Sequence, residues 1–555
     1  MAKIKTTKSV SSKRAAGLRD EFAFMSWMTA AWFMAILVFL PVYTHEAYAD
    51  VLVTKYSVCL WADGILIAGF VFWAVFAKRI GKYIKHMKSY ADPETGKWFW
   101  NWAKNTFSLL DGFMLGFLLI TVISTLQSSP YIYQAFFGNK GRWHGALIFI
   151  LYVLTYFIVS RYYRYRNWHI TVFLAMFLFI SVWAITDYFM LDMYSFKRGI
   201  SEEHYGIFVS TIGNIDTYTA IAMIPFAFAG VMFIQSDEKI WKILFYWVCS
   251  FVAMVSMITS AADNAYLSFF AFYVFAPFVA LKTKRGFRRL LIMLASFIGA
   301  IELVVFWNAK YAGQVVEPSG VISICAKIPQ LKYLLIALLV ITAFVYVYDL
   351  VIKKYAADTP LPKIVSKAWL IIVIVGFVGL IALFAIANTN DSAIPAALEP
   401  LKEYLIFSDS WGTWRGVVWK KLMELYAGLP IIHKIFGTGP ETINIYLYNQ
   451  YFEEIAKISG LMFDSPHNEL LQMFLNIGPL GLISYLGIFI TPSIMAAKRA
   501  LKKCYPFLAT VGIVCICHLF ECSVNIMVPM DIPVLFGLIA IASGVYRKSA
   551  KEVDG

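Results

Sequence analysis

Residues 369–388 read WLIIVIVGFVGLIALFAIAN and contain no charged side chain. A helix of about twenty residues is roughly 30 Å long, which matches the thickness of the hydrocarbon core of a membrane. Apolar runs of this kind recur along the whole 555-residue chain, 60% of which is hydrophobic. Backbone amides find no water in lipid, so such runs must be helical, and the short alternating segments of a membrane barrel are absent. The sequence predicts an all-α, polytopic transmembrane helix bundle.

The apolar runs define about 12–14 spans, and one long polar interval separates the last three from the rest. We therefore expect a basic tail (1–22), a membrane bundle of about eleven spans (23–388), a large loop (389–468), three C-terminal spans (469–546) and a short tail (547–555). The candidate spans are 23–44, 58–77, 106–126, 143–160, 169–187, 214–234, 243–260, 265–281, 290–306, 333–352, 369–388, 469–490, 506–524 and 532–546.

Positive charge is distributed unevenly between the loops. The amino-terminal tail and every second loop hold 34 of the 48 Lys and Arg, and the opposite loops hold the other 14. The positive-inside rule therefore places both termini in the cytoplasm and the 389–468 loop outside, in the cytoplasmic membrane. The net charge of +14 is thus a topology signal with some attraction to membrane lipids, and it does not indicate nucleic-acid binding.

Metal binding is not expected from the cysteines. The chain has 7 Cys and no Cys-x-x-Cys pair. Cys515, His518 and Cys522 fall on one face of a predicted helix, but three ligands from one straight helix cannot converge tetrahedrally on zinc. We instead expect His518 and Glu521 to line the outer end of a cavity.

The large loop contains a predicted amphipathic helix. Apolar residues recur with helical spacing between Thr413 and Tyr426, and Gly428 with Pro430 ends the pattern. We expect this helix to lie on the outer leaflet. Arg415 and Trp419 are four residues apart and can stack, which would hold a planar, bidentate donor at the height of lipid phosphates. The alternative is an ordinary headgroup anchor.

The loop closes with Asp464-Ser-Pro-His-Asn-Glu469. Ser465 is a suitable N-cap and Pro466 a suitable first residue, so we expect His467 in the first turn of the next membrane helix. Free backbone N–H groups and the positive end of the helix dipole favour anion binding there, and the dipole would keep His467 a neutral base. Such a site suits transfer of a group from a phosphate leaving group. A purely structural histidine is the alternative.

Acidic residues inside the spans fall mainly toward their outer ends, where a cavity open to the outer leaflet could use them. Asn214 and Asp216 open the sixth span, either as helix caps or as part of an outer vestibule. Asp263 lies in a very short outer turn, where polar residues are expected in any case. The acidic residues at outer ends are Asp63, Asp187, Asp216, Asp263 and Glu302.

Four motifs together resemble the O-antigen ligase and O-antigen polymerase superfamily, over roughly residues 410–545. Gly213-Asn-Ile-Asp216 is also similar to that family's Gly-Asn-Pro-Asn segment. The motifs are Trp414–Trp419 (WRGVVW), Ile435–Pro440 (IFGTGP), His467–Leu471 (HNELL) and Gly478–Gly481 (GPLG).

The resemblance implies a GT-C-like, inverting membrane glycosyltransferase that needs neither a metal nor a cofactor. Such enzymes move a glycan from undecaprenyl diphosphate, a lipid-linked donor, to a hydroxyl of a glycan or lipid acceptor at the outer face. Arg415 would bind the donor diphosphate, and His467 would act as base or diphosphate ligand. The expected substrate contacts are Asn214, Asp216, Asp263, Trp419, Asn468 and Glu469.

One departure from the family concerns a second cation. Relatives often carry a Ser-Arg pair where this chain has Ala262-Asp263-Asn264. A second cationic partner for the diphosphate must then come from elsewhere, and the outer-loop candidates are Arg142, Lys197 and Arg198.

Two other functions fit parts of the sequence. A transporter or lipid-linked-sugar flippase would need charged residues along the membrane midplane and no essential residue in the outer loop. A protein O-oligosaccharyltransferase would differ only in its acceptor.

Overall fold

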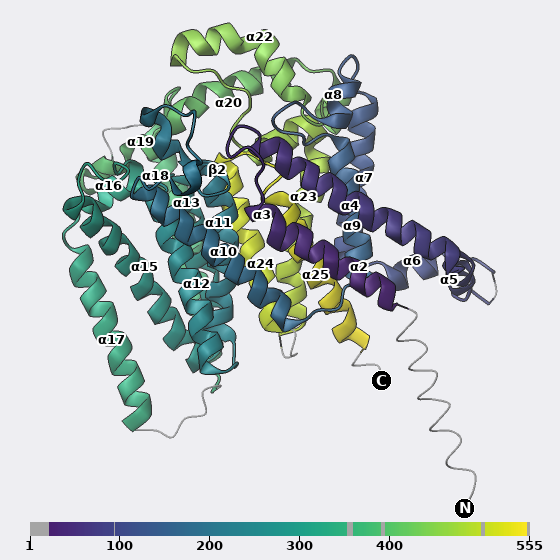
Figure 1. Cartoon of the computed structure of the whole chain (residues 1–555), viewed down its shortest axis with the longest axis horizontal. Helices are drawn as coiled ribbons and strands as arrows, with labels where there is room; N and C mark the ends of the chain where they lie inside the picture. The colour runs from purple at the N-terminus through teal and green to yellow at the C-terminus, as the bar shows by residue number, and fades with distance from the viewer. Residues whose placement is uncertain (1–21, 94, 352–358, 390–393, 501–504, 552–555) are drawn as a thin grey trace, which may run out of the picture.

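The computed structural model describes residues 22–93, 95–351, 359–389, 394–500 and 505–551. Over these residues the chain is a bundle of helices, and its only sheet is the small hairpin of β1 (Phe208–Val209) and β2 (Gly213–Asn214). Helix α2 begins and α25 ends at the lower end of the bundle in Figure 1, and the large loop covers the upper end. The predicted all-α fold is confirmed.

Each of the fourteen predicted spans coincides with an apolar helix, and twelve of these are long and apolar enough to cross a membrane. The chain is therefore a multi-pass membrane protein. The spans are α2–η1–α3 (Ala23–Phe33, Met34–Phe39, Leu40–Val42), α4 (Val51–Phe76), α7 (Leu109–Leu126), α9 (Ala146–Tyr162), α10 (Asn167–Tyr188), α11 (Ile215–Gln235), α12 (Ile240–Thr259), α13–α14 (Asn264–Phe275, Pro277–Ala280), α15 (Lys284–Lys310), α17 (Leu331–Val351), α18 (Lys363–Thr389), α23 (Glu469–Lys498), α24 (Tyr505–Glu521) and α25 (Ile532–Lys551).

The second span starts seven residues earlier than predicted. Lys55, which the sequence assigns to a loop, lies inside α4 and is fully buried. Its ammonium group donates to the carbonyl oxygens of Leu40 and Pro41, at 2.7 and 2.9 Å. Those carbonyls end the first span and have no helical donor, so the buried cation caps that helix and joins it to α4.

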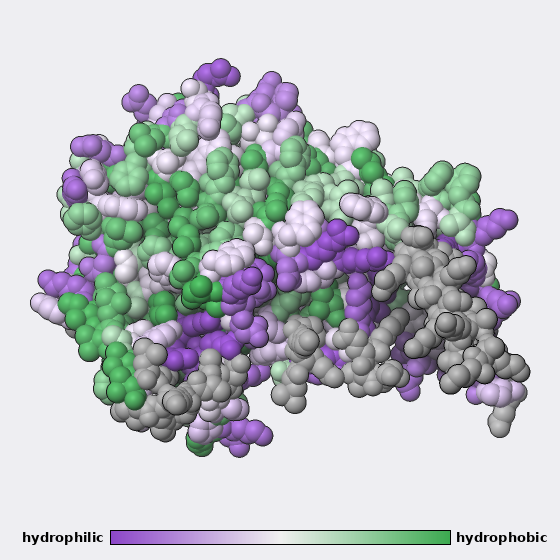
Figure 2. Space-filling model, turned by 60° about the horizontal axis from the view of Figure 1, so that its bottom comes forward, coloured by the Kyte–Doolittle hydropathy of each residue, from purple (hydrophilic) through white to green (hydrophobic). Residues whose placement is uncertain are grey.

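Helix α11 is the centre of the bundle. Every residue from Thr217 to Ile234 is buried, whereas α17 and α18 at the periphery bury almost none of their side chains. Helices α10, α12, α13, α15 and α24 pack around α11. The hydrophobic flank of the molecule is visible in Figure 2, with hydrophilic side chains gathered along its lower part.

The large loop folds into short helices over the upper end: η5 (Ala396–Leu401), α19 (Lys402–Leu405), α20 (Trp411–Gly428), α21 (Ile431–Phe436) and α22 (Thr442–Ser459). Helix α20 is the predicted amphipathic helix, but protein covers the apolar face that was expected to lie on the outer leaflet. Its apolar residues Val417, Val418, Leu422 and Leu425 are buried against α22 and Leu475 of α23. The sequence analysis did not predict α22. This helix supplies the apolar side chains that pack against the apolar face of α20.

The turn at Gly437-Thr438-Gly439, called the glycine turn below, attaches the loop to membrane helix α23. Gly478 has a left-handed backbone (φ +70°), and Pro479 follows it, so Leu475 lacks the N–H that would normally bond its carbonyl oxygen. The N–H groups of Thr438 and Gly439 donate instead to the carbonyl oxygens of Leu475 and Asn476, at 3.0 and 2.9 Å. The second and fourth motifs of the resemblance therefore meet in space.

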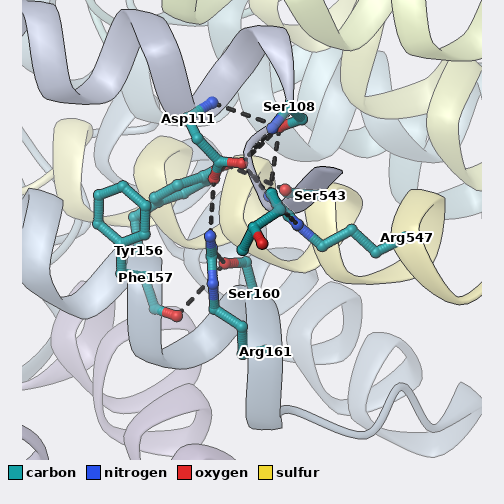
Figure 3. Close-up of polar contacts among 9 residues, drawn as sticks. Ser108, Asp111, Tyr156, Phe157, Ser160, Arg161, Ser543 and Arg547 are labelled. Carbon is teal, nitrogen blue, oxygen red and sulfur yellow. Dashed lines mark hydrogen bonds and ion pairs between the residues drawn. The ribbon is translucent and has the colours of Figure 1, made fainter. Parts of the chain in front are cut away.

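The lower end of the bundle is fastened by the buried carboxylate of Asp111 on α7 (Figure 3). Arg161 of α9 approaches it at 3.1 Å, Arg547 of α25 also pairs with it, and the hydroxyl of Tyr156 donates to it at 2.8 Å. Residues 547–551, predicted as a tail, thus belong to α25; residues 1–21 and 552–555 lie outside the described chain.

We expect Asp111→Asn to lower the free energy of unfolding by about 3 kcal/mol, because it leaves two partly buried guanidinium groups without their carboxylate. The measurement is the thermal unfolding midpoint of the purified protein in detergent. Asp237→Asn, at an exposed position, is the control and should leave the midpoint unchanged. Equal midpoints for both variants would contradict the role of Asp111.

Candidate functional site

The loop meets the bundle where α23 begins. The side chain of Asn468 accepts a hydrogen bond from the Leu471 N–H at 2.9 Å, so Asn468 is the N-cap and the helix starts at Glu469. The predicted cap at Ser465 is therefore wrong, and His467 precedes the helix instead of lying in its first turn. His467 has a left-handed backbone, φ +47°, a conformation that non-glycine residues seldom adopt without a constraint.

Arg415 faces the bundle. Gly412, Thr413 and Trp414 all have left-handed backbones, so the regular part of α20 begins with Arg415. Its guanidinium lies 3.6 Å from the Asp216 carboxylate at the start of α11 and donates to the Gly412 carbonyl at 3.2 Å. The predicted stacking of Arg415 on Trp419 is wrong, because the carboxylate of Asp216 attracts the cation away from the indole.

Trp419 instead connects α20 to the irregular segment that precedes α23. Its indole N–H donates to the Pro466 carbonyl at 2.7 Å, and its ring packs against those of Trp411 and Phe407. The position of His467 is thus tied to the helix that carries Arg415.

Arg142 holds the same segment through two other residues. Its side chain is almost completely buried and donates to Asp464 at 2.5 Å and to the Ser465 hydroxyl at 3.0 Å. Of the other two candidate cations, Lys197 is buried beside Asp187 at 3.6 Å, and Arg198 is exposed. Arg142 is therefore the candidate that the structure brings to His467.

The electrostatic environment keeps His467 neutral. Burial lowers its pKa to about 4, and the positive charges of Arg415 and Arg142 act in the same direction, while Asp464 opposes them. The expected direction is thus correct, but its main causes are desolvation and two guanidinium groups.

Asn214, Asp216 and Asp263 lie on the bundle side of Arg415. Asn214 caps α11 by accepting from the Asp216 N–H at 2.8 Å. Asp263 accepts from the Val321 N–H of α16 (Gly320–Ala326) at 2.9 Å and from the Tyr404 hydroxyl at 2.6 Å. Asn214 and Asp263 therefore have structural partners, whereas the partly exposed carboxylate of Asp216 faces the cation of Arg415.

A buried amide network lies beneath Asp216. Asn264 and Asn525 both donate to the Glu521 carboxylate, Asn264 at 2.9 Å, and both also donate to the backbone carbonyl of Asp216. Sequence reasoning identified Glu521, named Asn264 only as part of the 262–264 segment and missed Asn525. The network was not foreseen because its members come from segments that are far apart in the chain. The network fixes the beginning of α11.

Glu469 points into the bundle and not toward the loop. It is buried, accepts from the Tyr485 hydroxyl and lies 3.5 Å from Nε2 of His518. The predicted substrate contact is thus replaced by contacts with α23 and α24.

Glu441 is a further buried acid that the sequence did not single out. It follows the glycine turn, accepts from Gln472 at 3.1 Å, and its pKa is raised to about 7, mainly by burial. Arg142 lowers that pKa, so Glu441 lies near the same guanidinium as His467. The only local signal was its position directly after Gly-Thr-Gly-Pro.

Comparison with known families singles out the region of the loop. Residues 332–486 match the O-antigen ligase family. This match supports the resemblance to the O-antigen ligase and polymerase superfamily, and together with the apolar helices it indicates an O-antigen ligase-like membrane glycosyltransferase. The matched region contains Arg415 and His467 but not Arg142 or Asp216. No curated protein matches the chain.

The pair of Arg415 and Asp216 can be tested by exchanging its charges. Asp216→Arg places two cations together and should lower the free energy of unfolding by about 1 kcal/mol, because the pair is partly exposed. The double variant Asp216→Arg/Arg415→Asp should recover most of that loss, as measured by the thermal unfolding midpoint. A double variant no more stable than the single one would contradict the pairing.

Proposed function

We propose that this protein transfers a glycan from undecaprenyl diphosphate to a hydroxyl of a glycan or lipid acceptor, at the outer face of the cytoplasmic membrane. The observation that carries the proposal is a neutral His467 placed near two arginines, at the end of a loop in the family-matched region. Loop charges support the orientation, because the lysine-rich loops lie on the other side from this loop.

In the proposed reaction the donor diphosphate is bound by Arg415 and Arg142. A guanidinium group donates to phosphate oxygens in a bidentate manner, and Asp216 at 3.6 Å is a weaker partner for Arg415 than a diphosphate would be. The two N–H groups at the start of α23 that Asn468 does not cap add partial positive charge. Arg142 takes the place of the second cation that the 262–264 segment lacks.

His467 serves as the general base. The acceptor hydroxyl attacks the anomeric carbon of the donor sugar from the side opposite the diphosphate, and its proton passes to neutral His467. The bond from the anomeric carbon to the diphosphate oxygen breaks, and the two arginines stabilise the charge on the departing group. Attack from the opposite side inverts the anomeric configuration. No step calls for a metal ion.

The other predicted contacts have supporting roles. Asp216 is positioned to accept hydrogen bonds from the acceptor beside Arg415. Asn468 and Trp419 hold the segment that carries His467, and Asn214 and Asp263 hold the starts of α11 and α16.

The first test is the extracellular glycan profile of cells in which the variant replaces the natural protein. We expect His467→Ala, Arg415→Gln and Arg142→Gln each to abolish long glycan, with lipid-linked single units accumulating outside. Arg198→Gln removes the same charge at an exposed site and is the control, with all variants checked for equal membrane levels. An unchanged profile for His467→Ala would refute the catalytic role, and intermediates trapped inside the cell would favour a flippase.

The second test is pH dependence. Because His467 is protonated only near pH 4, the initial transfer rate in membrane vesicles should stay constant from pH 8 to about 5 and fall below that. The unfolded chain takes up this proton near pH 6.5, so the contribution of His467 to stability is full above 6.5 and decreases as pH falls toward 4. A rate that declines with an inflection near 6.5 would contradict the buried, neutral base.

A further inference from the structure

Behind His467, three buried side chains from two parts of the chain converge. Glu469 starts α23, His518 lies in the last turn of α24, and Cys522 starts the short helix η6 (Cys522–Val524). One carboxylate oxygen, one imidazole nitrogen and the sulfur all lie within 4.8 Å of one another. Each of the three residues is at most 1% exposed.

The spacing within this cluster resembles that of ligands around one ion. Nε2 of His518 and Oε1 of Glu469 are 3.5 Å apart. A good N–H···O hydrogen bond spans about 2.7–3.2 Å. Two ligands with bonds of about 2.0–2.1 Å in tetrahedral geometry lie roughly 3.3 Å apart, which is close to the observed separation. The Tyr485 hydroxyl also contacts both atoms, donating to Oε1 of Glu469 and lying 3.4 Å from Nε2 of His518.

Unpaired polar atoms give an independent indication. Oε2 of Glu469, the second oxygen of the same carboxylate, is buried and has no hydrogen-bond partner among the described residues. Nδ1 of His518 is also unpaired there, but it is the ring nitrogen that does not pair with Glu469. Leaving such atoms unpaired away from water is costly. A third acid, Asp531 just before α25, is also buried. A bound cation would compensate the negative charge that gathers here.

We propose that Glu469, His518 and Cys522 bind a zinc ion. Carboxylate, imidazole and thiolate are the usual ligands of Zn²⁺, and binding would release the thiol proton of Cys522. Asp531 or a water molecule completes the four-coordinate shell. Helix α24 alone cannot surround an ion, and Glu469 from α23 supplies the ligand from another direction. The Tyr485 hydroxyl, which donates to Glu469, orients that ligand.

The ion would join the first residue of α23 to the end of α24. His467 lies only two residues before Glu469, so the site would fix the start of the helix without contacting the substrate. It is therefore a structural site, separate from the reaction proposed above, and its occupancy can be measured without any activity.

Metal analysis by mass spectrometry tests this site. The full-length protein is purified in detergent without chelators, after growth in medium containing zinc. We expect about one zinc per chain, and less than a tenth of that in Cys522→Ser and His518→Gln. Cys517→Ser is the matched control, because Cys517 is a buried cysteine outside the cluster, on the helix α24 that carries His518, and this variant should keep its zinc.

Cobalt substitution tests the ligands directly. Protein produced with Co²⁺ in place of zinc should show a thiolate-to-cobalt absorption band in the near ultraviolet, and Cys522→Ser should lose it. If the variants fail to fold, the zinc content of the wild-type protein still tests the proposal. Zinc at background level in that protein would overturn it. Zinc that persists in both ligand variants would also overturn it, because the metal would then lie elsewhere.

Discussion

The missing N–H of Pro479 is the constraint on which the loop and its site depend. A helix interrupted at Gly478 and Pro479 leaves carbonyl oxygens without donors inside a membrane protein, where an unpaired polar group is expensive. The glycine turn supplies the donors, and only glycine fits, because a Cβ at Gly437 would collide with the Asn476 carbonyl and one at Gly478 with that of Ile435. The same turn is held from α7, since Gln127 donates to the Gly437 carbonyl at 2.9 Å. A polar loop is thereby fixed to two membrane helices through the backbone.

Charge in the site is arranged so that one base stays neutral among cations. Arg415 and Arg142 each have an acidic partner, Asp216 and Asp464, which limits the cost of burying them. His467 lies within the influence of both guanidinium groups, and protonating it would add a third positive charge. Arginine cannot give up its proton, so the histidine is the group that stays neutral before the proposed proton transfer. An anion entering this site therefore meets fixed positive charge and a free basic nitrogen at once.

The fold could be predicted from sequence because hydrophobic length alone determines a membrane span. The site was predicted only in part. Local patterns singled out His467 and Arg415 as candidates. They could not identify the partner of Arg415, since Asp216 is about 200 residues away in the chain. Residue preferences also failed to locate the start of α23, because Ser465 and Asn468 are equally good N-caps by residue type. The Ser465 hydroxyl instead accepts a hydrogen bond from Arg142, and Asn468 caps the helix. Tertiary contacts of this kind override intrinsic preference.

The complete burial of α11 has a consequence for how the protein is made. One side of this helix is covered by α24, which leaves the ribosome about 290 residues later. Until then that side must face lipid or the insertion machinery, which its apolar surface tolerates. Asn264 and Asn525, which fix the first turn of α11, likewise come from opposite halves of the sequence. The first turn of α11 therefore acquires its final polar neighbours only when synthesis is nearly finished, so a truncated chain would insert into the membrane without assembling the site.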